Sequence, residues 1–299
     1  MKGTIRKKFN RHNELSGILF VLPLIIYFLI FQVMPMLMAF GISFTDWKII
    51  DKPKFVGLTN YIQLFTDSYL YPYFWRSLLT TVIYILLTVP FSIAITLVVS
   101  AILNSNIKGE GVFKTIFYIP SVTAGAAVAA TWKFMVDPQY GLINQILGTN
   151  FSLLSNKYTA LPTLAFMSVW GGLGYNVLIM HAAMKGINKE LYDAAAIDGA
   201  GFIKTFFKVT IPSVKPIILF LSVTSLIGGF QAFDQMYFMT GGGPNKATLT
   251  YMYQVYNLVN LEIPNMGAAS AMSYILLLII LGVTAVQFFL ARERGEDRE

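Results

Sequence analysis

LSGILFVLPLIIYFLIFQVMPMLMAFGISFT, residues 15–45, contains no charged side chain. A bilayer hydrocarbon core needs about 20 mostly apolar helical residues, so this stretch predicts a membrane-spanning helix. It is too long to be the apolar core of a secretory signal, and no small-x-small cleavage site follows a shorter apolar run. We therefore expect the stretch to be retained as a first span.

Five more uncharged runs are long enough to cross a bilayer. They are Ser77–Ile107, Thr115–Trp132, Tyr158–Met184, Pro216–Phe233 and Ile263–Ala291. The uncharged stretch Pro138–Asn156 is interrupted by Gly, Asn, Gln and Ser, and we expect a loop there. The predicted fold class is an all-α, polytopic membrane protein with six transmembrane helices. Its parts are an N-terminal arm (residues 1–14), a membrane domain (15–291) and a tail (292–299).

The composition of the whole chain supports this fold class. Of the 299 residues, 56% are hydrophobic and 12% are charged, whereas a soluble domain carries roughly 25% charged residues. The absence of cysteine excludes a disulfide scaffold and thiolate chemistry. The net charge of +7 is scattered over short hydrophilic gaps, so it does not form the basic patch typical of nucleic-acid binding.

The distribution of Lys and Arg predicts the orientation in the membrane. Counted over alternate gaps between spans, 15 basic residues fall on one side and 7 on the other. Basic residues are enriched in cytoplasmic loops, so both termini are expected in the cytoplasm. Every gap except the first external loop follows this bias.

The longest cytoplasmic gap, residues 185–215, separates the fourth and fifth spans and reads KGINKELYDAAAIDGAGFIKTFFKVTIPSVK. Asn188 is suited to cap a helix that begins at Lys189. The acidic Glu190 and Asp193 lie in the early turns, where the helix dipole favours negative charge. Gly199 is suited to end this helix.

A second amphipathic segment, residues 202–209, is expected to end at Pro212. Two interpretations of this cytoplasmic gap follow from the residues alone. A thin, alanine-rich helix can seat in a groove of another protein. Alternatively, a helical hairpin can lie on the lipid headgroups with its lysines at the phosphates.

The stretch Asp193-Ala194-Ala195, with Gly199 and the later Val209-x-Ile211-Pro212, resembles the EAA motif of permease subunits of binding-protein-dependent ABC importers. The longer form YDAAAIDGA resembles the carbohydrate branch of this type I family. Asp193 stands where the family usually has Glu, which shortens the side chain by one methylene. Other stretches that resemble the family follow in the same order: GILFVLPLIIYFLIF, SFTDW, FVGLTNY, YIPSVTAGAAVAATWKFMVDPQYGLIN and FDQMYFMTGGGPNKAT.

The resemblance implies a role for the helix after Lys189 and a set of partners. The helix would be the coupling helix, which docks into a cleft of an ATP-hydrolysing subunit. Its candidate residues are Glu190, Asp193, Ala194, Ala195, Asp198, Gly199 and Ala200. The implied partners are a second permease subunit in a heterodimer, two ATP-binding subunits, an extracellular or periplasmic solute-binding protein and membrane lipid, without nucleic acid. The implied location is a bacterial or archaeal cell membrane.

Several kinds of chemistry are missing from the sequence. No GxxxxGK[ST] loop is present to hold a nucleotide phosphate, so ATP and Mg are expected on a partner and this chain is expected not to be an enzyme. With only His12, His181 and no cysteine, a metal site is not expected. A Ser/His/acid site would have to use His181, and the fourth span has no acid to orient it.

The spans lack the ionisable residues that proton relays and ion-coupled carriers use. Neutral polar and aromatic groups suit an uncharged polyol, so the expected cargo is a sugar or oligosaccharide. The candidate pathway residues are Trp170, Tyr175, Asn176, Ser222, Ser225, Gln231 and Asp234. Close helix packing is an equal alternative for Ser222, Ser225 and Gly229. Alternative functions are import of a phosphorylated polyol or another organic solute, and a stand-alone secondary carrier.

Overall fold

The computed structural model of the protein describes residues 11–105 and 107–296, which are mostly helical and include one two-stranded sheet. The chain divides into two compact units. Unit 1 comprises Met1–Ile62 and Leu258–Tyr274, and unit 2 comprises Gln63–Asn257 and Ile275–Glu299. Residues of both units occur in α3 (Thr59–Thr66), α13 (Tyr251–Val259) and α14 (Met266–Glu296).

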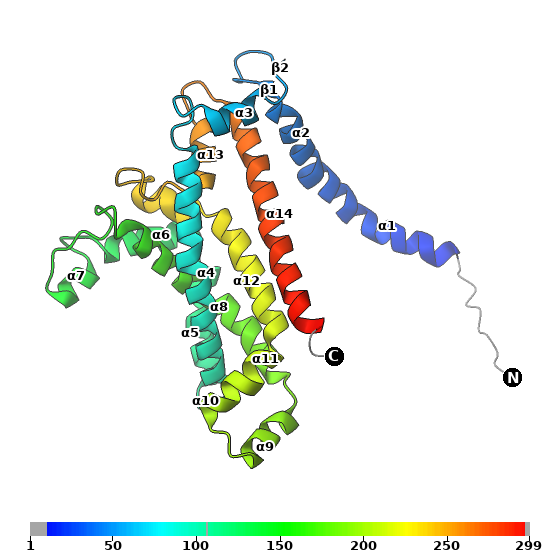
Figure 1. Cartoon of the computed structure of the whole chain (residues 1–299), viewed down its shortest axis with the longest axis vertical. Coiled ribbons are helices and arrows are strands. Elements are labelled where there is room, and N and C mark those ends of the chain that lie inside the picture. The colour runs from blue at the N-terminus through cyan, green and yellow to red at the C-terminus, as the bar shows by residue number, and fades with distance from the viewer. Residues whose placement is uncertain (1–10, 106, 297–299) are drawn as a thin grey trace. The chain divides into compact units, whose positions relative to one another are not determined.

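Unit 1 starts with one continuous helical stretch (Figure 1). It consists of α1 (Arg11–Phe28), the π-helical turn η1 (Leu29–Val33) and α2 (Met34–Ser43). The strands β1 (Thr45–Asp46) and β2 (Lys54–Phe55) then pair antiparallel. The side chain of Asn60 donates to the backbone oxygens of Ser43 and Thr45 at 2.8 and 2.9 Å. These two bonds join the end of α2 to the start of α3.

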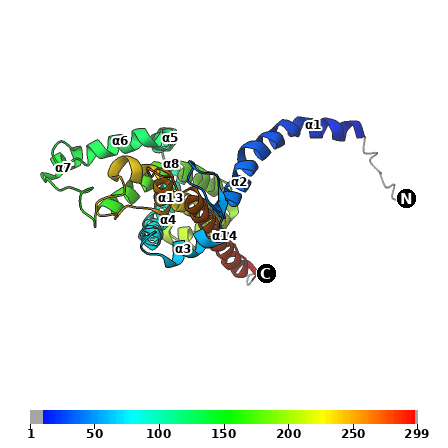
Figure 2. The same cartoon turned by 90° about the horizontal axis from the view of Figure 1, so that it is seen from above.

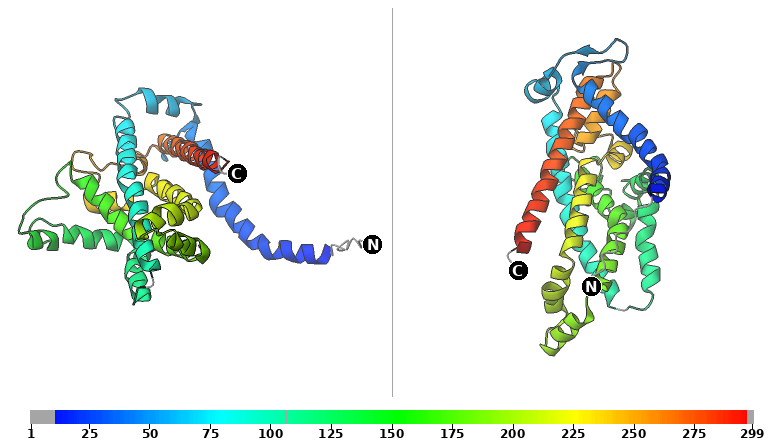
Figure 3. Two further views of the ribbon diagram at one scale, coloured as in Figure 1. Left: turned by 60° about the horizontal axis from the view of Figure 1, so that its bottom comes forward. Right: turned by 90° about the vertical axis from the view of Figure 1, so that its right-hand side faces the viewer.

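Unit 2 contains the remaining helices. They are α4 (Phe74–Asn104), α5 (Glu110–Val122), α6 (Gly125–Met135), α7 (Leu142–Leu147), α8 (Ala160–Lys185), α9 (Lys189–Ile197), α10 (Phe202–Thr205), α11 (Ile211–Ser213) and α12 (Lys215–Phe230), with the π-helical turns η2 (Phe206–Thr210) and η3 (Met236–Thr240). The helices α4, α8 and α12 contact one another, and α5 packs against α8. In the right-hand view of Figure 3, α5 and α12 lie on either side of α8.

Four helical stretches of the described chain are long and apolar enough to cross a bilayer. They are Ile18–Ser43, Phe74–Asn104, Ala160–Lys185 and Met266–Ala291, which coincide with the first, second, fourth and sixth expected spans. The third and fifth expected spans fall in bent helix pairs. One pair is Glu110–Val122 with Gly125–Met135, bent by 102°, and the other is Phe202–Ser213 with Lys215–Phe230, bent by 70°.

The third expected span is broken because the backbone leaves the helical region between α5 and α6. Thr123 and Ala124 have ψ angles of 138° and 131°, which are extended values. Pro120 lies in the last turn of α5 and has no N–H to donate, which already weakens that turn. The structure therefore differs from a single helix within residues 115–132, and α6 leads away from α5 toward α7 (Figure 2).

The second amphipathic segment was expected to end at Pro212, and the helical stretch through α10, η2 and α11 ends one residue later, at Ser213. One further expectation differs from the structure. The uncharged stretch expected to be a loop contains the short helix α7, which ends at Gly148 with φ of +63°. A single turn of helix with a left-handed glycine cap leaves almost no periodic pattern in the sequence.

Candidate functional site

A stripe of small polar residues runs along the buried face of α4. Its members are Ser77, Thr81, Thr88, Ser92, Thr96 and Ser100, all of which are buried. They recur at intervals of four or seven residues, which places them on one face of a helix. Thr81 and Thr88 donate to carbonyl oxygens one turn earlier on the same helix, at 2.9 Å each. Hydroxyls bonded in this way can be buried in an apolar environment at little cost.

The middle of this stripe borders a cavity of about 400 Å³ between α4, α8 and α12. The lining residues are Tyr84, Thr88, Val89, Ser92, Ser121, Ser168, Val169, Gly171, Gly172, Tyr175, Asn176, Thr224, Ser225, Gly228 and Gly229. Hydroxyl and amide groups supply the polar part of this lining. None of these lining residues carries a charge. The volume falls in the range of small-molecule sites.

Two side-chain bridges cross between the helices at the cavity. Asn176 of α8 donates from Nδ2 to Ser92 Oγ of α4 at 3.0 Å. Gln235, which lies just before η3, donates from Nε2 to Tyr84 Oη at 2.6 Å and to Ser168 Oγ at 3.1 Å. Each bridge satisfies amide groups that would be costly to bury unpaired. Together they fix the positions of α4 and α8 on the two sides of the cavity.

Glycines leave space in the cavity wall. A side chain at Gly171, Gly172 or Gly228 would meet no atom within 4 Å, so these positions keep the cavity open. Gly229 has a different role, because a Cβ atom there would lie 2.7 Å from Cγ1 of Ile85. Gly229 therefore allows α12 to approach α4 closely, as the packing alternative from the sequence suggests.

The structure brings three of the seven candidate pathway residues to the cavity: Tyr175, Asn176 and Ser225. Ser222 is half-buried on α12 and does not line it. Trp170 is 41% exposed and packs edge-on against Trp132, with ring centroids 5.6 Å apart.

The other two candidates lie beyond α12. Gln231 is the exposed residue that directly follows the helix, and it does not line the cavity. Asp234 is exposed, and its Oδ2 would lie 3.2 Å from a Cβ atom placed at Gly125.

Sequence reasoning missed several cavity residues, among them Tyr84, Ser92 and Ser168, as well as the bridging Gln235. The stripe on α4 could have indicated Ser92, which is one of its members, because its spacing is visible in the sequence. No such pattern marks Gln235, which lies after the end of α12 and reaches Tyr84 through the tertiary fold.

The helix expected from Lys189 is present as α9, beyond the ends of α8 and α12 (Figure 1). Asn188 Oδ1 accepts from the backbone N–H of Glu190 at 3.1 Å, which caps its first turn. At the other end, Gly199 has φ of +65°, Ala200 N donates to Ala195 O and Gly199 N donates to Ala196 O. This pair of bonds is a Schellman motif.

The α9 helix has no buried residue. Tyr192 Oη lies 3.1 Å from Thr210 Oγ1 of η2, within hydrogen-bond distance. The acidic Glu190, Asp193 and Asp198 are exposed, and so is Ala194. Two apolar side chains are also exposed, Leu191 at 48% and Ile197 at 87%. The outer face of α9 is thus free to contact another protein.

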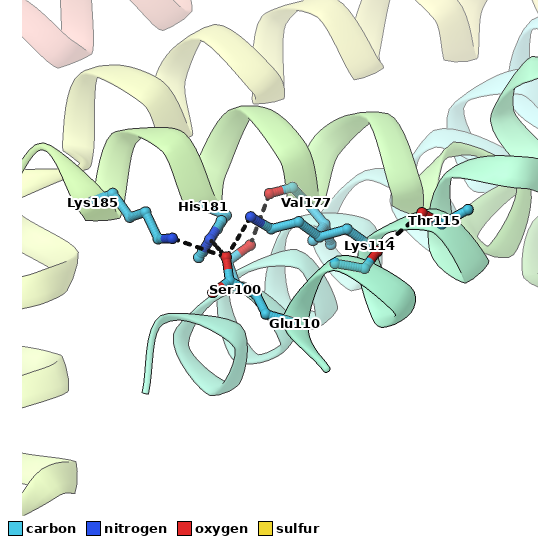
Figure 4. A network of polar contacts seen from close by, with 8 residues as sticks. Ser100, Glu110, Lys114, Thr115, Val177, His181 and Lys185 are labelled. Carbon is cyan, nitrogen blue, oxygen red and sulfur yellow. Dashed lines mark hydrogen bonds and ion pairs between the residues drawn. The ribbon is translucent and has the colours of Figure 1, made fainter. Parts of the chain in front are cut away.

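A cluster of charged groups lies where α5 begins and α8 ends (Figure 4). Oε1 of Glu110 accepts from Lys114 Nζ at 2.5 Å, from His181 Nε2 at 2.8 Å and from Lys185 Nζ at 2.9 Å. Lys114 lies on α5, whereas His181 and Lys185 lie on α8. Across the described residues, no three His, Cys, Asp or Glu side chains lie close enough together to hold a metal ion.

A family model described as "Binding-protein-dependent transport system inner membrane component" matches residues 64–295. The chain belongs to this family. It is accordingly a multi-pass protein of a bacterial cell membrane and a subunit of a transport system.

Two relatives agree with this membership, and a solved structure shares the fold. The lactose transport system permease protein LacF of Rhizobium radiobacter is 33% identical, over 98% of this chain and 100% of LacF. The sn-glycerol-3-phosphate transport system permease protein UgpA of Yersinia pestis bv. Antiqua (strain Antiqua) is 35% identical, over 79% of each chain. A chain of a bacterial ABC transporter that imports the acidic polysaccharide alginate has the same fold, with a TM-score of 0.80, 20% identity and coverage of 94% and 96%.

Proposed function

We propose that this family member forms half of the translocation pathway of an ATP-driven ABC importer for a sugar or oligosaccharide. The observation that carries the proposal is the cavity between α4, α8 and α12, with its hydroxyl and amide lining. Sugars present hydroxyls that donate and accept hydrogen bonds, and Ser, Thr, Tyr and Asn side chains do the same.

A neutral saccharide is the cargo class that this lining favours. Similar proteins are named for lactose, for sn-glycerol-3-phosphate and for the acidic alginate. A phosphorylated or acidic cargo calls for Arg or Lys near its anionic group, and the cavity lining contains neither. The import of a phosphorylated polyol therefore remains the second candidate.

The proposed topology has six spans over residues 15–291, with the arm 1–14 and the tail 292–299 in the cytoplasm. Four long apolar helices and two bent pairs supply the six segments. The most apolar 18-residue window within Ile18–Ser43 has no buried residue and a mean hydropathy of 2.4, so lipid and the second permease subunit of a heterodimer are its proposed neighbours. A solute-binding protein delivers the cargo from outside.

The α9 helix is the proposed coupling helix, with Glu190, Asp193, Ala194, Ala195, Asp198, Gly199 and Ala200 as contact residues for an ATP-binding subunit. Its exposed face and its caps at both ends support this role. Two ATP-binding subunits supply ATP and Mg chemistry, and this chain binds no cofactor itself. Movement of α9 toward its partner then changes access to the cavity.

The proposal is tested with Ala194→Arg in the complex reconstituted with its ATP-binding subunits and binding protein. The side chain of Ala194 is exposed, so the chain tolerates Arg there, whereas a docked partner does not. We expect membrane insertion as in the wild type and loss of at least 90% of the ATPase activity stimulated by binding protein loaded with a neutral saccharide. Ala194→Ser keeps the side chain small and is the matched control.

Unchanged stimulation in Ala194→Arg would remove the coupling assignment. A panel of neutral saccharides and phosphorylated polyols, tested as competitors for uptake, separates the two cargo classes. Competition by the phosphorylated polyols alone contradicts the choice of a neutral saccharide.

A further inference from the structure

The Glu110 cluster links two helices through a single carboxylate oxygen. Lys114 is one turn further along the same helix, so its bond to Glu110 is local. The other two donors, His181 and Lys185, come from the last turns of α8. Glu110 is therefore the point at which the first residue of α5 is fastened to the cytoplasmic end of α8.

The direction of the bond between His181 and Glu110 follows from the carboxylate. A carboxylate oxygen accepts hydrogen bonds, so Nε2 of His181 donates to Oε1 of Glu110. The His181 side chain is 3% exposed, so this bond has a buried donor.

Apart from the Glu110 cluster, α5 is attached to the rest of unit 2 through the face that packs against α8, its main contact. None of the residues of α5 is buried. Gly174 permits this contact, because a Cβ atom there would overlap the backbone carbonyl of Phe117. The contacts between α5 and α8 therefore include the Glu110 cluster at the start of α5 and the close approach of Phe117 to Gly174 in its middle.

The two ends of α5 lie near two sites of the proposed transport function. Glu110, at its start, is bonded to Lys185, the last residue of α8, and only two residues separate Lys185 from Asn188, the cap of α9. Ser121, near the other end of α5, lines the cavity. The Glu110 cluster and α5 thus form a second connection from the α9 end of α8 to the cavity wall, beside α8 itself, which lines the cavity directly.

We propose that Glu110 is a positioning residue, which transmits movement of α9 through α5 to the cavity. This inference rests on the proposed coupling role of α9. The ion pair between α5 and α8 contributes little to stability, because the Lys185 side chain is 50% exposed to solvent. A mechanical link between α8 and α5 requires a bond between the two helices with a buried partner. The bond of Glu110 to the buried His181 has both properties.

The first test is Glu110→Gln in the reconstituted complex. We expect cargo-stimulated ATPase activity and uptake to fall at least tenfold, with basal ATPase activity and the thermal midpoint close to those of the wild type. His181→Gln keeps an amide donor near the position of Nε2 and should retain at least half of the stimulation. His181→Asn moves the amide toward the position of Nδ1 and should behave like Glu110→Gln.

The second test uses the absence of cysteine in the natural chain. In Glu110→Cys/His181→Cys, a short bifunctional methanethiosulfonate replaces the ionic link by a covalent one. We expect the linked protein to regain stimulated ATPase activity and to lose it again on reduction with dithiothreitol. This test does not depend on the stability of the Gln variant.

The inference would be overturned by full stimulation in Glu110→Gln, or by a linked double-cysteine protein that is less active than the reduced one. Parallel loss of basal activity and thermal midpoint would show a structural role only, and would equally overturn it. The wild-type complex is the reference. If it shows no cargo-stimulated ATPase activity, the proposed function itself fails, independently of Glu110.

Discussion

At the scale of single residues, the structure separates side chains that the sequence treats alike. Asn176 and Gln231 are both pathway candidates because an amide facing lipid is costly. Asn176 is buried, lines the cavity and bridges to Ser92. Gln231 is exposed and lies outside the cavity lining. An amide that faces lipid is costly at either position. Which of the two amides lines the cavity depends on the tertiary fold.

Replacing Asn176 with Leu should therefore impair transport, whereas Gln231→Leu should not. Leu removes the donor to Ser92 and leaves a buried hydroxyl unpaired, at a cost of about 1–3 kcal/mol. We expect about tenfold slower uptake of a neutral saccharide, since each 1.36 kcal/mol is tenfold in rate, with basal ATPase activity unchanged. Uptake by proteoliposomes measures the difference, and equal rates in the two variants would assign Asn176 to packing alone.

At the scale of elements, local signals in the sequence located α9 well. A capping Asn188, early acids and Gly199 act within one turn of the helix ends, so their effect does not depend on distant contacts. The break at Val214 follows Pro212, where the sequence predicts the end of the amphipathic segment, but the break at Thr123 was not visible in the same way. An uninterrupted apolar run shows where a segment is buried, but a bend within it depends on backbone angles that hydropathy does not encode.

Contact between α5 and α8 gives an element-scale prediction for Gly174→Ala. The added Cβ overlaps the backbone of Phe117, so the two helices must separate. Overpacking of this kind costs about 1–3 kcal/mol. We expect a thermal midpoint several degrees lower for the purified protein, measured by intrinsic fluorescence.

Gly282→Ala on α14 is the matched control for this helix contact. A Cβ atom at Gly282 meets nothing within 4 Å, and alanine favours a helix over glycine by about 1 kcal/mol. Its midpoint should be unchanged or slightly higher. An equal decrease in both variants would contradict the role of Gly174 as a close-approach position.

At the scale of the whole molecule, hydropathy predicted six membrane-spanning helices, and the structure has four of them as single long helices and the other two in bent helix pairs. The orientation is a different kind of prediction, because it comes from counting basic residues. Tyr69 and Ile197 are 93% and 87% exposed, and they fall on opposite sides in the proposed topology. These two positions allow the orientation to be measured directly.

Single-cysteine labelling checks this topology in a chain that has no natural cysteine. In intact spheroplasts, a membrane-impermeant maleimide should label Tyr69→Cys, whereas Ile197→Cys should require permeabilisation. Labelling after permeabilisation is the control for accessibility of both thiols. The reverse pattern would invert the proposed orientation and place α9 outside the cell.

The hydroxyl lining of the cavity also bears on how the importer acquires new cargoes. A Ser, Thr or Tyr hydroxyl can rotate and can either donate or accept a hydrogen bond. Such a lining offers similar bonds to epimers that differ only in whether a hydroxyl is axial or equatorial. We therefore expect stereochemical selection to lie upstream of this chain, so that exchanging the delivery protein alone would suffice to change the sugar that enters.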